Sequence, residues 1–151
     1  MLLVIEILGV YLVYLQLLIL VIGLFMRRYR PVAVIAFISA SVSAILGWFL
    51  KNNFYLPRPY IFSGHLPVLP YLLDGAFPSN HTAVAVAVSI TVFLRHRIWG
   101  LAFGFMAILV AAGRIIGGVH SFFDILAGAA LGSLVALFVE FISARIKALL
   151  F

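Results

Sequence analysis

Arg114, His120 and Asp124 bring a guanidinium, an imidazole and a carboxylate into an otherwise apolar part of the chain. On a helix, His120 and Asp124 would share a face, because residues four apart lie one turn from each other. A carboxylate beside an imidazole fixes the tautomer of the ring and raises its nucleophilicity. A guanidinium matches a pair of phosphate oxygens. These residue types and spacings predict a phosphate site in which His120 does the chemistry.

The composition indicates that membrane helices must position these residues. Of the 151 residues, 66% are hydrophobic and 9% are charged, whereas a soluble domain is about a quarter charged. We therefore expect an all-α fold, a polytopic transmembrane helix bundle, that forms one membrane-embedded domain over residues 1–151. The absence of cysteine excludes disulfides and thiolate metal sites. The net charge of +6 fits the basic flanks of membrane spans, so no nucleic acid partner is expected.

Apolar stretches of roughly 20 residues, the length that crosses a bilayer, predict five spans. They cover approximately residues 1–26, 31–50, 79–94, 98–116 and 121–143. The first stretch, with the arginines that follow it, is expected to be an N-terminal anchor helix over residues 1–30 and not a signal peptide. Residues 52–77 are rich in proline, which predicts a loop with room for one short interfacial helix.

The basic residues predict the orientation of the spans. Seven of the ten fall at one end, which the positive-inside rule places in the cytoplasm: Arg27, Arg28, Arg30, Arg95, Arg97, Arg145 and Lys147. The C-terminus is then cytoplasmic, in a multi-pass protein of the cell (plasma or inner) membrane. Lys51, Arg58 and Arg114 would lie at the outer (periplasmic or extracellular) end, where topology gives no reason for a basic residue.

Helix lengths predict that these unexplained polar residues meet at one level. With a rise of about 1.5 Å per residue, Lys51 lies roughly 31 Å along its helix from Arg30. By the same rise, Asp124 lies roughly 31 Å from Arg145. Both lengths approach the ~30 Å thickness of the hydrocarbon core. We therefore expect a site on the outer face, at the outward end of the four C-terminal helices.

Three motifs reach this level: Lys51-x6-Arg58-Pro59, Pro78-Ser79-Asn80-His81 and Gly113-Arg114-x5-His120-x3-Asp124. They resemble the K-x6-R-P, P-S-G-H and S-R-x5-H-x3-D pattern of the phosphatidic acid phosphatase type 2 superfamily, which also contains the vanadium haloperoxidases. The resemblance covers residues 50–141, the motif-bearing core. Asn80 stands where the family usually has glycine, and Gly113 where it usually has serine. The family also usually has six spans.

The resemblance implies a role for each residue of the motifs. His120 would attack phosphorus and form a phosphohistidine, with Asp124 orienting its ring. His81 would protonate the leaving oxygen and then activate water. The residues that would bind the phosphate are Lys51, Arg58, Ser79, Asn80 and Arg114. No metal and no cofactor would be required, because lysine and arginine supply the charge stabilisation.

Each of these residues also has a purely structural interpretation. Ser121-Phe-Phe-Asp124 matches a capping box that would open the fifth span, and this role is compatible with an active-site role. Lys51 taken alone would mark a helix end. His81 or His120 taken alone would be an interior histidine. The functional interpretation rests on the three motifs together.

The leading interpretation is a metal-independent phosphatase that acts on a membrane lipid phosphate or diphosphate. From the resemblance, undecaprenyl diphosphate, phosphatidylglycerol phosphate, phosphatidate and the 1-phosphate of lipid A are all candidate substrates. Residues 52–77 would select among them, with His65 and Asp74 as candidates for headgroup contact. The alternative is a non-catalytic anion-binding or lipid-transporting membrane protein. The expected partners are the lipid substrate and the bilayer, and a homo-oligomer is left open.

Overall fold

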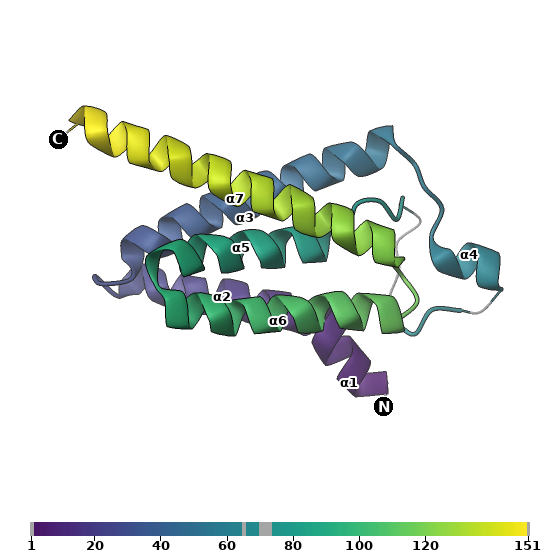
Figure 1. Cartoon of the computed structure of the whole chain (residues 1–151). Coiled ribbons are helices and arrows are strands. Elements are labelled where there is room, and N and C mark those ends of the chain that lie inside the picture. The colour runs from purple at the N-terminus through teal and green to yellow at the C-terminus, as the bar shows by residue number, and fades with distance from the viewer. Residues whose placement is uncertain (1, 65, 70–73, 151) are drawn as a thin grey trace.

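The chain folds into helices that lie side by side along one axis, as the computed structural model in Figure 1 shows. The structure describes residues 2–64, 66–69 and 74–150. The helices are α1 (Leu2–Glu6), η1 (Ile7–Tyr11), α2 (Leu12–Phe25), α3 (Arg30–Asn53), α4 (Pro59–Ser63), α5 (Asn80–Arg95), α6 (Arg97–Ile116) and α7 (Phe122–Leu150). Met1 of the predicted first span and His65, a candidate for headgroup contact, lie outside the described residues.

Four helical segments of the described chain are long and apolar enough to cross a membrane: Leu2–Phe25, Arg30–Asn53, Arg97–Ile116 and Phe122–Ala148. The first of them consists of α1, η1 and α2. Helix α5 is also apolar but has only 16 residues. The chain is therefore a multi-pass membrane protein. That α5 crosses the membrane as well, which would make five spans, stays a prediction.

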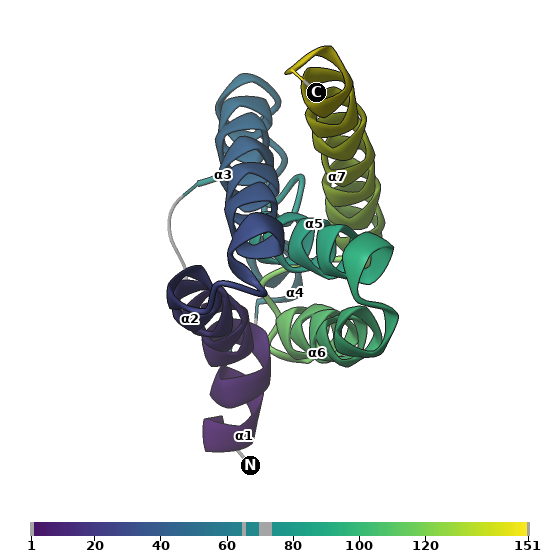
Figure 2. The ribbon, with the colours of Figure 1, turned by 90° about the vertical axis from the view of Figure 1, so that its left-hand side faces the viewer.

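Helix α5 lies at the centre of the bundle, where it contacts α3, α6 and α7 (Figure 2). Small residues permit this close packing. A Cβ on Gly132 of α7 would lie 2.2 Å from the carbonyl oxygen of Ala83. On the other side of α5, the Thr91 hydroxyl donates to Ser39 Oγ of α3 at 3.0 Å. Helix α5, whose first turn carries the second motif, is thus held between α7 and α3.

The N-terminal helix is interrupted by the π-helical turn η1, which packs on α6. Two glycines meet there: a Cβ on Gly113 would lie 2.4 Å from the backbone nitrogen of Gly9. Farther along the chain, Gln16 Nε2 donates to the Phe103 carbonyl at 2.8 Å. The N-terminal helix is therefore fixed to α6 at two levels.

Two helix boundaries differ from those predicted. Helix α7 continues to Leu150 and does not end near Ser143, because the residues that follow are mostly good helix formers without glycine or proline. Helix α3 continues to Asn53, so Lys51 lies in its last turn and not beyond its end. The proline-rich loop contains one short helix, α4, as the sequence predicts.

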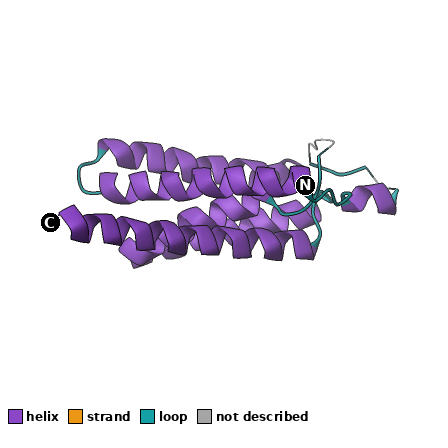
Figure 3. Cartoon of the chain, turned by 90° about the horizontal axis from the view of Figure 1, so that it is seen from above, coloured by secondary structure: helices purple, strands orange, loops and turns teal. Residues whose placement is uncertain are grey.

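The basic turns gather at one end of the bundle. The α2–α3 turn, the α5–α6 turn and the C-terminal end of α7 lie on the same side in Figure 1, and α7 projects beyond the others. Helix α4 and the N-terminus lie at the opposite end (Figure 3). At the basic end, Arg95 binds Glu140 through two hydrogen bonds of 2.8 Å, which join α5 to α7.

Candidate active site

A cavity of about 280 Å³ brings together most of the predicted site residues. Six of them line it: Lys51, Arg58, Asn80, His81, Arg114 and His120. They come from α3, the loop that follows it, the start of α5, the end of α6 and the turn after α6. Val10, Tyr14 and Asp74 complete the described lining. Segments that are far apart in the sequence thus place five basic or imidazole side chains and one amide around one small space.

His120 lies in the turn before α7, which begins at Phe122, so the expectation that His120 and Asp124 share a helix face is wrong. The turn nevertheless brings His120 Nδ1 to 3.8 Å from Asp124 Oδ2. On the other side of the ring, Nε2 lies 3.3 Å from Arg114 Nη2. Because a guanidinium only donates, Nε2 is the acceptor and the ring proton is on Nδ1, toward the carboxylate. The unprotonated nitrogen therefore faces the cavity's cations.

The His120 ring is neutral at physiological pH. Burial lowers the pKa of this imidazole to about 4, the Asp124 carboxylate opposes the shift, and the nearby positive charges of Arg114, Lys51 and Arg58 add to it. A neutral imidazole retains the lone pair that a nucleophile needs.

Ser121 and Asp124 form the predicted capping box at the start of α7. The Ser121 backbone N–H donates to Asp124 Oδ2 at 2.6 Å, and the Asp124 backbone N–H donates to Ser121 Oγ at 3.3 Å. The oxygen that accepts from Ser121 is the one that faces His120 Nδ1. The carboxylate that caps the helix is therefore also the one that lies beside the imidazole.

Backbone carbonyls hold two of the cations in place. Arg58 Nη1 donates to the Val119 carbonyl at 3.0 Å, and Nε donates to the Asp74 carbonyl at 3.3 Å. Lys51 Nζ donates to the Gly75 carbonyl at 2.8 Å. Both side chains are buried. The loop between α3 and α5 thus fixes the positions of both charges.

Asp74 brings a carboxylate to the same two cations. It pairs with Arg58 Nη2, and its other oxygen lies 3.6 Å from Lys51 Nζ. Burial alone would raise the pKa of Asp74, but the hydrogen bond from Arg58 and the charges of Lys51 and Arg58 outweigh it and hold the pKa below its ordinary value. The carboxylate is ionised and competes with any phosphate for these cations. From the sequence alone, Asp74 is a candidate only for headgroup contact.

The N-terminal helix contributes directly to the cavity. Arg114 Nη1 donates to the Gly9 carbonyl at 3.5 Å. Val10 and Tyr14 line the cavity, and the Tyr14 ring meets the His81 ring edge-on at 6.3 Å. From the sequence alone, this helix is expected only to anchor the chain. The signal that could have revealed more is a glycine and a tyrosine within an apolar run.

Ser79 does not line the cavity, unlike its neighbours Asn80 and His81. It is fully buried, its N–H donates to the Asp124 carbonyl at 3.0 Å, and its hydroxyl accepts from Thr82 Oγ1 at 3.1 Å. The structure therefore places the Ser79 side chain away from the other predicted phosphate ligands. Its backbone bond instead ties the start of α5 to the start of α7.

Asn80, which replaces the usual glycine, is accommodated by a glycine in the facing helix. A Cβ on Gly47 of α3 would lie 1.9 Å from Asn80 Oδ1. The amide side chain thus occupies space that any larger residue at position 47 would fill. The first backbone N–H groups of α5 have no partner within the helix, and its positive dipole end lies at the cavity.

Two solved structures share the fold. LpxE of Aquifex aeolicus superposes with a TM-score of 0.73 at 26% sequence identity, over 89% of this chain and 84% of that chain. A PAP2 type phosphatidylglycerolphosphate phosphatase from Bacillus subtilis superposes with a TM-score of 0.70 at 21% identity, over 95% of this chain and 74% of that chain. The second likeness shows the fold alone.

Sequence relatives match over a comparable part of the chain. The bacitracin transport permease protein BcrC of Bacillus licheniformis is 34% identical over 108 residues, which are 71% of this chain and 52% of the relative. The undecaprenyl-diphosphatase BcrC of Bacillus subtilis is 30% identical over 114 residues, 75% of this chain and 56% of the relative. An undecaprenyl-diphosphatase of Sulfolobus acidocaldarius is 29% identical over 126 residues, 82% of this chain and 59% of the relative.

This chain therefore spans little more than half the length of these relatives. The family model described as the PAP2 superfamily matches residues 5–146, which include all three motifs and the N-terminal helix that contacts them. On this match, the chain belongs to the PAP2 superfamily.

Proposed function

We propose that this chain is a membrane phosphatase that removes phosphate from a lipid diphosphate, with undecaprenyl diphosphate as its substrate. The observation that carries the proposal is the orientation of His120, whose Nδ1 faces Asp124 and whose Nε2 faces Arg114. An imidazole held in this way is a nucleophile directed at an anion site. Residues 1–151 act as one domain, in which the core of residues 50–141 carries the chemistry.

In the first step, His120 Nε2 attacks phosphorus. A P–N bond forms as the P–O bond to the leaving oxygen breaks, and His81 gives that oxygen a proton. Asp124 stabilises the positive charge that develops on the His120 ring. Lys51, Arg58 and Arg114 neutralise the charge on the equatorial phosphate oxygens, and N–H groups at the start of α5 add hydrogen bonds.

In the second step, His81 takes a proton from water and the water oxygen attacks phosphorus. The P–N bond breaks, inorganic phosphate leaves and His120 becomes neutral again. Three cations already supply the charge stabilisation that metal ions give in other phosphatases. We therefore propose that no metal or cofactor takes part. EDTA should leave the activity intact, and a loss in EDTA that Mg²⁺ reverses would contradict this part of the mechanism.

The choice of substrate rests on charge and on the relatives. A lipid diphosphate carries more negative charge than a monoester, which suits a cavity in which three cations outnumber the one carboxylate, Asp74. Two sequence relatives are named undecaprenyl-diphosphatases. The measurement is phosphate release by the purified protein in detergent, with undecaprenyl diphosphate compared with phosphatidate and phosphatidylglycerol phosphate. A higher kcat/KM on a monoester would change the substrate and leave the reaction class in place.

We also propose an outward-facing site in the cell membrane. The seven basic residues named in the sequence analysis belong to the end of the bundle opposite the cavity, and the positive-inside rule assigns that end to the cytoplasm. The polar end of the lipid then meets the cavity at the outer face, while the prenyl chain stays between helices in the bilayer.

The rival function is a non-catalytic anion-binding or lipid-transporting protein. The relative from Bacillus licheniformis is named a transport permease, so this alternative needs a direct test. A binder or transporter needs the cations of the cavity but not a nucleophile. Only the phosphatase proposal gives a reason for an imidazole placed between Asp124 and Arg114.

His120→Gln separates the two functions. As a phosphatase, the variant should lose at least about 1,000-fold in kcat, the scale expected when a nucleophile is removed, and still bind vanadate. Lys147→Gln is the control, because Lys147 is exposed near the C-terminal end of α7, at the other end of the bundle, and should leave turnover unchanged. Normal hydrolysis by His120→Gln would refute the assignment of the nucleophile.

A further inference from the structure

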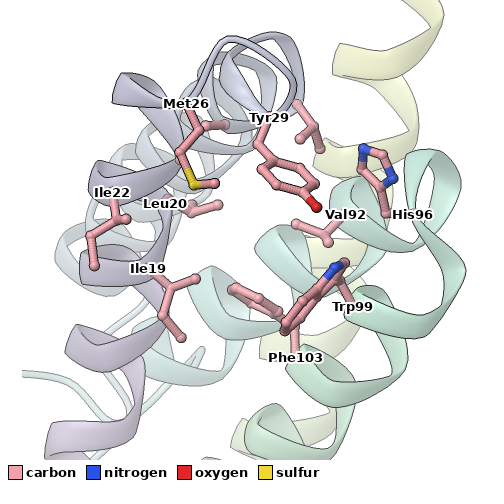
Figure 4. A pocket seen from close by; sticks show the side chains of 12 residues that line it. Ile19, Leu20, Ile22, Met26, Tyr29, Val92, His96, Trp99 and Phe103 are labelled. Carbon is pink, nitrogen blue, oxygen red and sulfur yellow. The ribbon is translucent and has the colours of Figure 1, made fainter.

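A second cavity, a cleft of about 340 Å³, lies at the basic end of the bundle between α2 and α6 (Figure 4). Its lining side chains include Ile19, Leu20, Ile22 and Met26 on one wall and Trp99 and Phe103 on the other. Tyr29 and His96 also line it, and their rings meet edge to face at 5.5 Å. The size falls in the range of small-molecule sites, and the lining is mostly apolar.

The cleft has a fixed structural origin. Helix α6 is held against the N-terminal helix at the contact between Gly9 and Gly113, and again where Gln16 donates to the Phe103 carbonyl. Beyond that bond, toward the basic end, the facing walls of α2 and α6 enclose the cleft. The cleft thus lies between these two helices, beyond the contacts that hold them together.

The residues that neighbour the cleft lining in the sequence are strongly basic. The chain has four acidic residues. Asp74 and Asp124 are paired around the first cavity, Glu6 belongs to the N-terminal turn, and Glu140 is bound by Arg95. Among the described residues, these pairings leave four arginines beside the cleft-lining residues without a carboxylate partner: Arg27, Arg28, Arg30 and Arg97.

One of these arginines lies close to the lining itself. The Arg28 guanidinium lies 5.6 Å from the centroid of the Tyr29 ring, and Tyr29 lines the cleft. Arg97 directly follows His96, another lining residue, but its guanidinium lies 5.9 Å from the centroid of the Phe93 ring, which is not part of the lining. A positive group therefore lies beside the cleft on the α2–α3 turn.

We propose that this cleft binds one acyl chain of an anionic membrane phospholipid, whose phosphate is held by Arg28 and its neighbouring arginines on the α2–α3 turn. The apolar walls match an acyl chain, and guanidinium groups match phosphate oxygens. Basic pockets between membrane helices on the cytoplasmic side are suited to anionic head groups. Because the cleft lies at the opposite end from His120, this lipid is a bound component and not the substrate.

The two tryptophans of the chain allow a direct test. Both are more than half exposed, Trp99 at 55% and Trp48 at 63%, but only Trp99 lines the cleft, whereas Trp48 lies on α3. Trp48→Phe leaves Trp99 as the reporter, and Trp99→Phe leaves Trp48 as the control. Each variant is reconstituted in phosphatidylcholine vesicles that contain brominated-chain phosphatidylglycerol or brominated-chain phosphatidylcholine. Half-quenching of Trp99 should need an about fivefold lower fraction of brominated phosphatidylglycerol than of brominated phosphatidylcholine. Trp48 should be quenched equally by the two lipids.

In the Trp48→Phe background, Arg28→Gln should reduce the preference of Trp99 for the anionic lipid. Arg145→Gln is the matched control, because Arg145 lies at the same end of the bundle on α7, over the Phe141 ring. As a measurement without variants, phosphatidylglycerol added to the detergent-solubilised chain should raise its Tm more than phosphatidylcholine does. Equal quenching of Trp99 by both lipids would overturn the proposal, and so would a Trp99 that neither lipid quenches because a second copy of the chain fills the cleft.

Discussion

Asp74 and Arg58 form an ion pair in the wall of the cavity that also contains His120. The Asp74 carboxylate balances charge that a phosphate would otherwise take up, since it also lies 3.6 Å from Lys51 Nζ. We therefore expect Asp74→Asn to bind inorganic phosphate and vanadate about tenfold more tightly. The measurement is the inhibition constant of each anion in the phosphate-release assay. Glu140→Gln, which removes a carboxylate at the other end, should leave both constants unchanged. Weaker inhibition of Asp74→Asn would mean that Asp74 mainly positions the cations.

Gly113 is expected to be intolerant of the serine that the family usually has at this position. A Cβ there would lie 2.4 Å from the backbone nitrogen of Gly9, so the N-terminal helix would have to move and the contact between Arg114 and the Gly9 carbonyl would be lost. We expect Gly113→Ser to lower stability by about 1–3 kcal/mol, the cost of overpacking. The measurement is thermal unfolding in detergent, together with kcat.

Gly104 provides the control for this substitution. It lies on the same helix, α6, and a Cβ there would have no neighbour within 4 Å among the described residues. Gly104→Ala should be neutral or slightly stabilising, because alanine favours a helix more than glycine does. Equal destabilisation by the two substitutions would mean that the contact with Gly9 is not the cause.

The pair Gly47 and Asn80 predicts a compensating double variant. Gly47→Ala should push the Asn80 side chain toward the cavity, because the new Cβ would lie 1.9 Å from Oδ1, and thereby reduce kcat/KM. Asn80→Gly removes the obstructed side chain and keeps the backbone N–H. The double variant should therefore recover most of the activity that Gly47→Ala loses. Additive losses would show that the two positions act independently.

The pH dependence of kcat/KM should follow the lowered pKa of His120. The neutral ring is the nucleophile, and its pKa is about 4, so protonation becomes limiting only below about pH 4, where the rate should fall about tenfold per unit. Because the Asp124 carboxylate raises this pKa, Asp124→Asn should move the acid limb to lower pH while kcat falls. An acid limb that moves to higher pH would contradict the assigned charge contact.

The sequence predicted those parts of the site that depend on spacing within one helix or motif. Helix rise fixes depth along each span and thereby predicts Lys51 and Arg114 at one level, and both line the cavity. The capping box of Ser121 and Asp124 was equally predictable, since its bonds are local. Membership of an all-helical membrane bundle followed from composition alone.

The parts that the sequence could not predict depend on contacts between distant segments. Apolar residues surround the first helix on every side, so its pattern does not show that Gly9 and Tyr14 face Arg114 and His81. The pairing of Asp74 with Arg58 depends on the path of a proline-rich loop, which carries no periodicity. The end of α7 could not be predicted for a different reason, because no glycine or proline marks it in the sequence.

The shortness of α5 has a consequence for the surrounding bilayer. Sixteen residues extend over roughly 24 Å, some 6 Å less than the ~30 Å hydrocarbon layer. With α5 as a fifth span, as the sequence predicts, the cavity that Asn80 and His81 line at the start of this helix would lie below the plane of the neighbouring headgroups. A substrate would reach the cavity either by moving deeper into the bilayer or because the bilayer is locally thinned around the protein. Turnover should accordingly be faster in thin bilayers than in thick ones, which makes the elasticity of the membrane part of the reaction barrier.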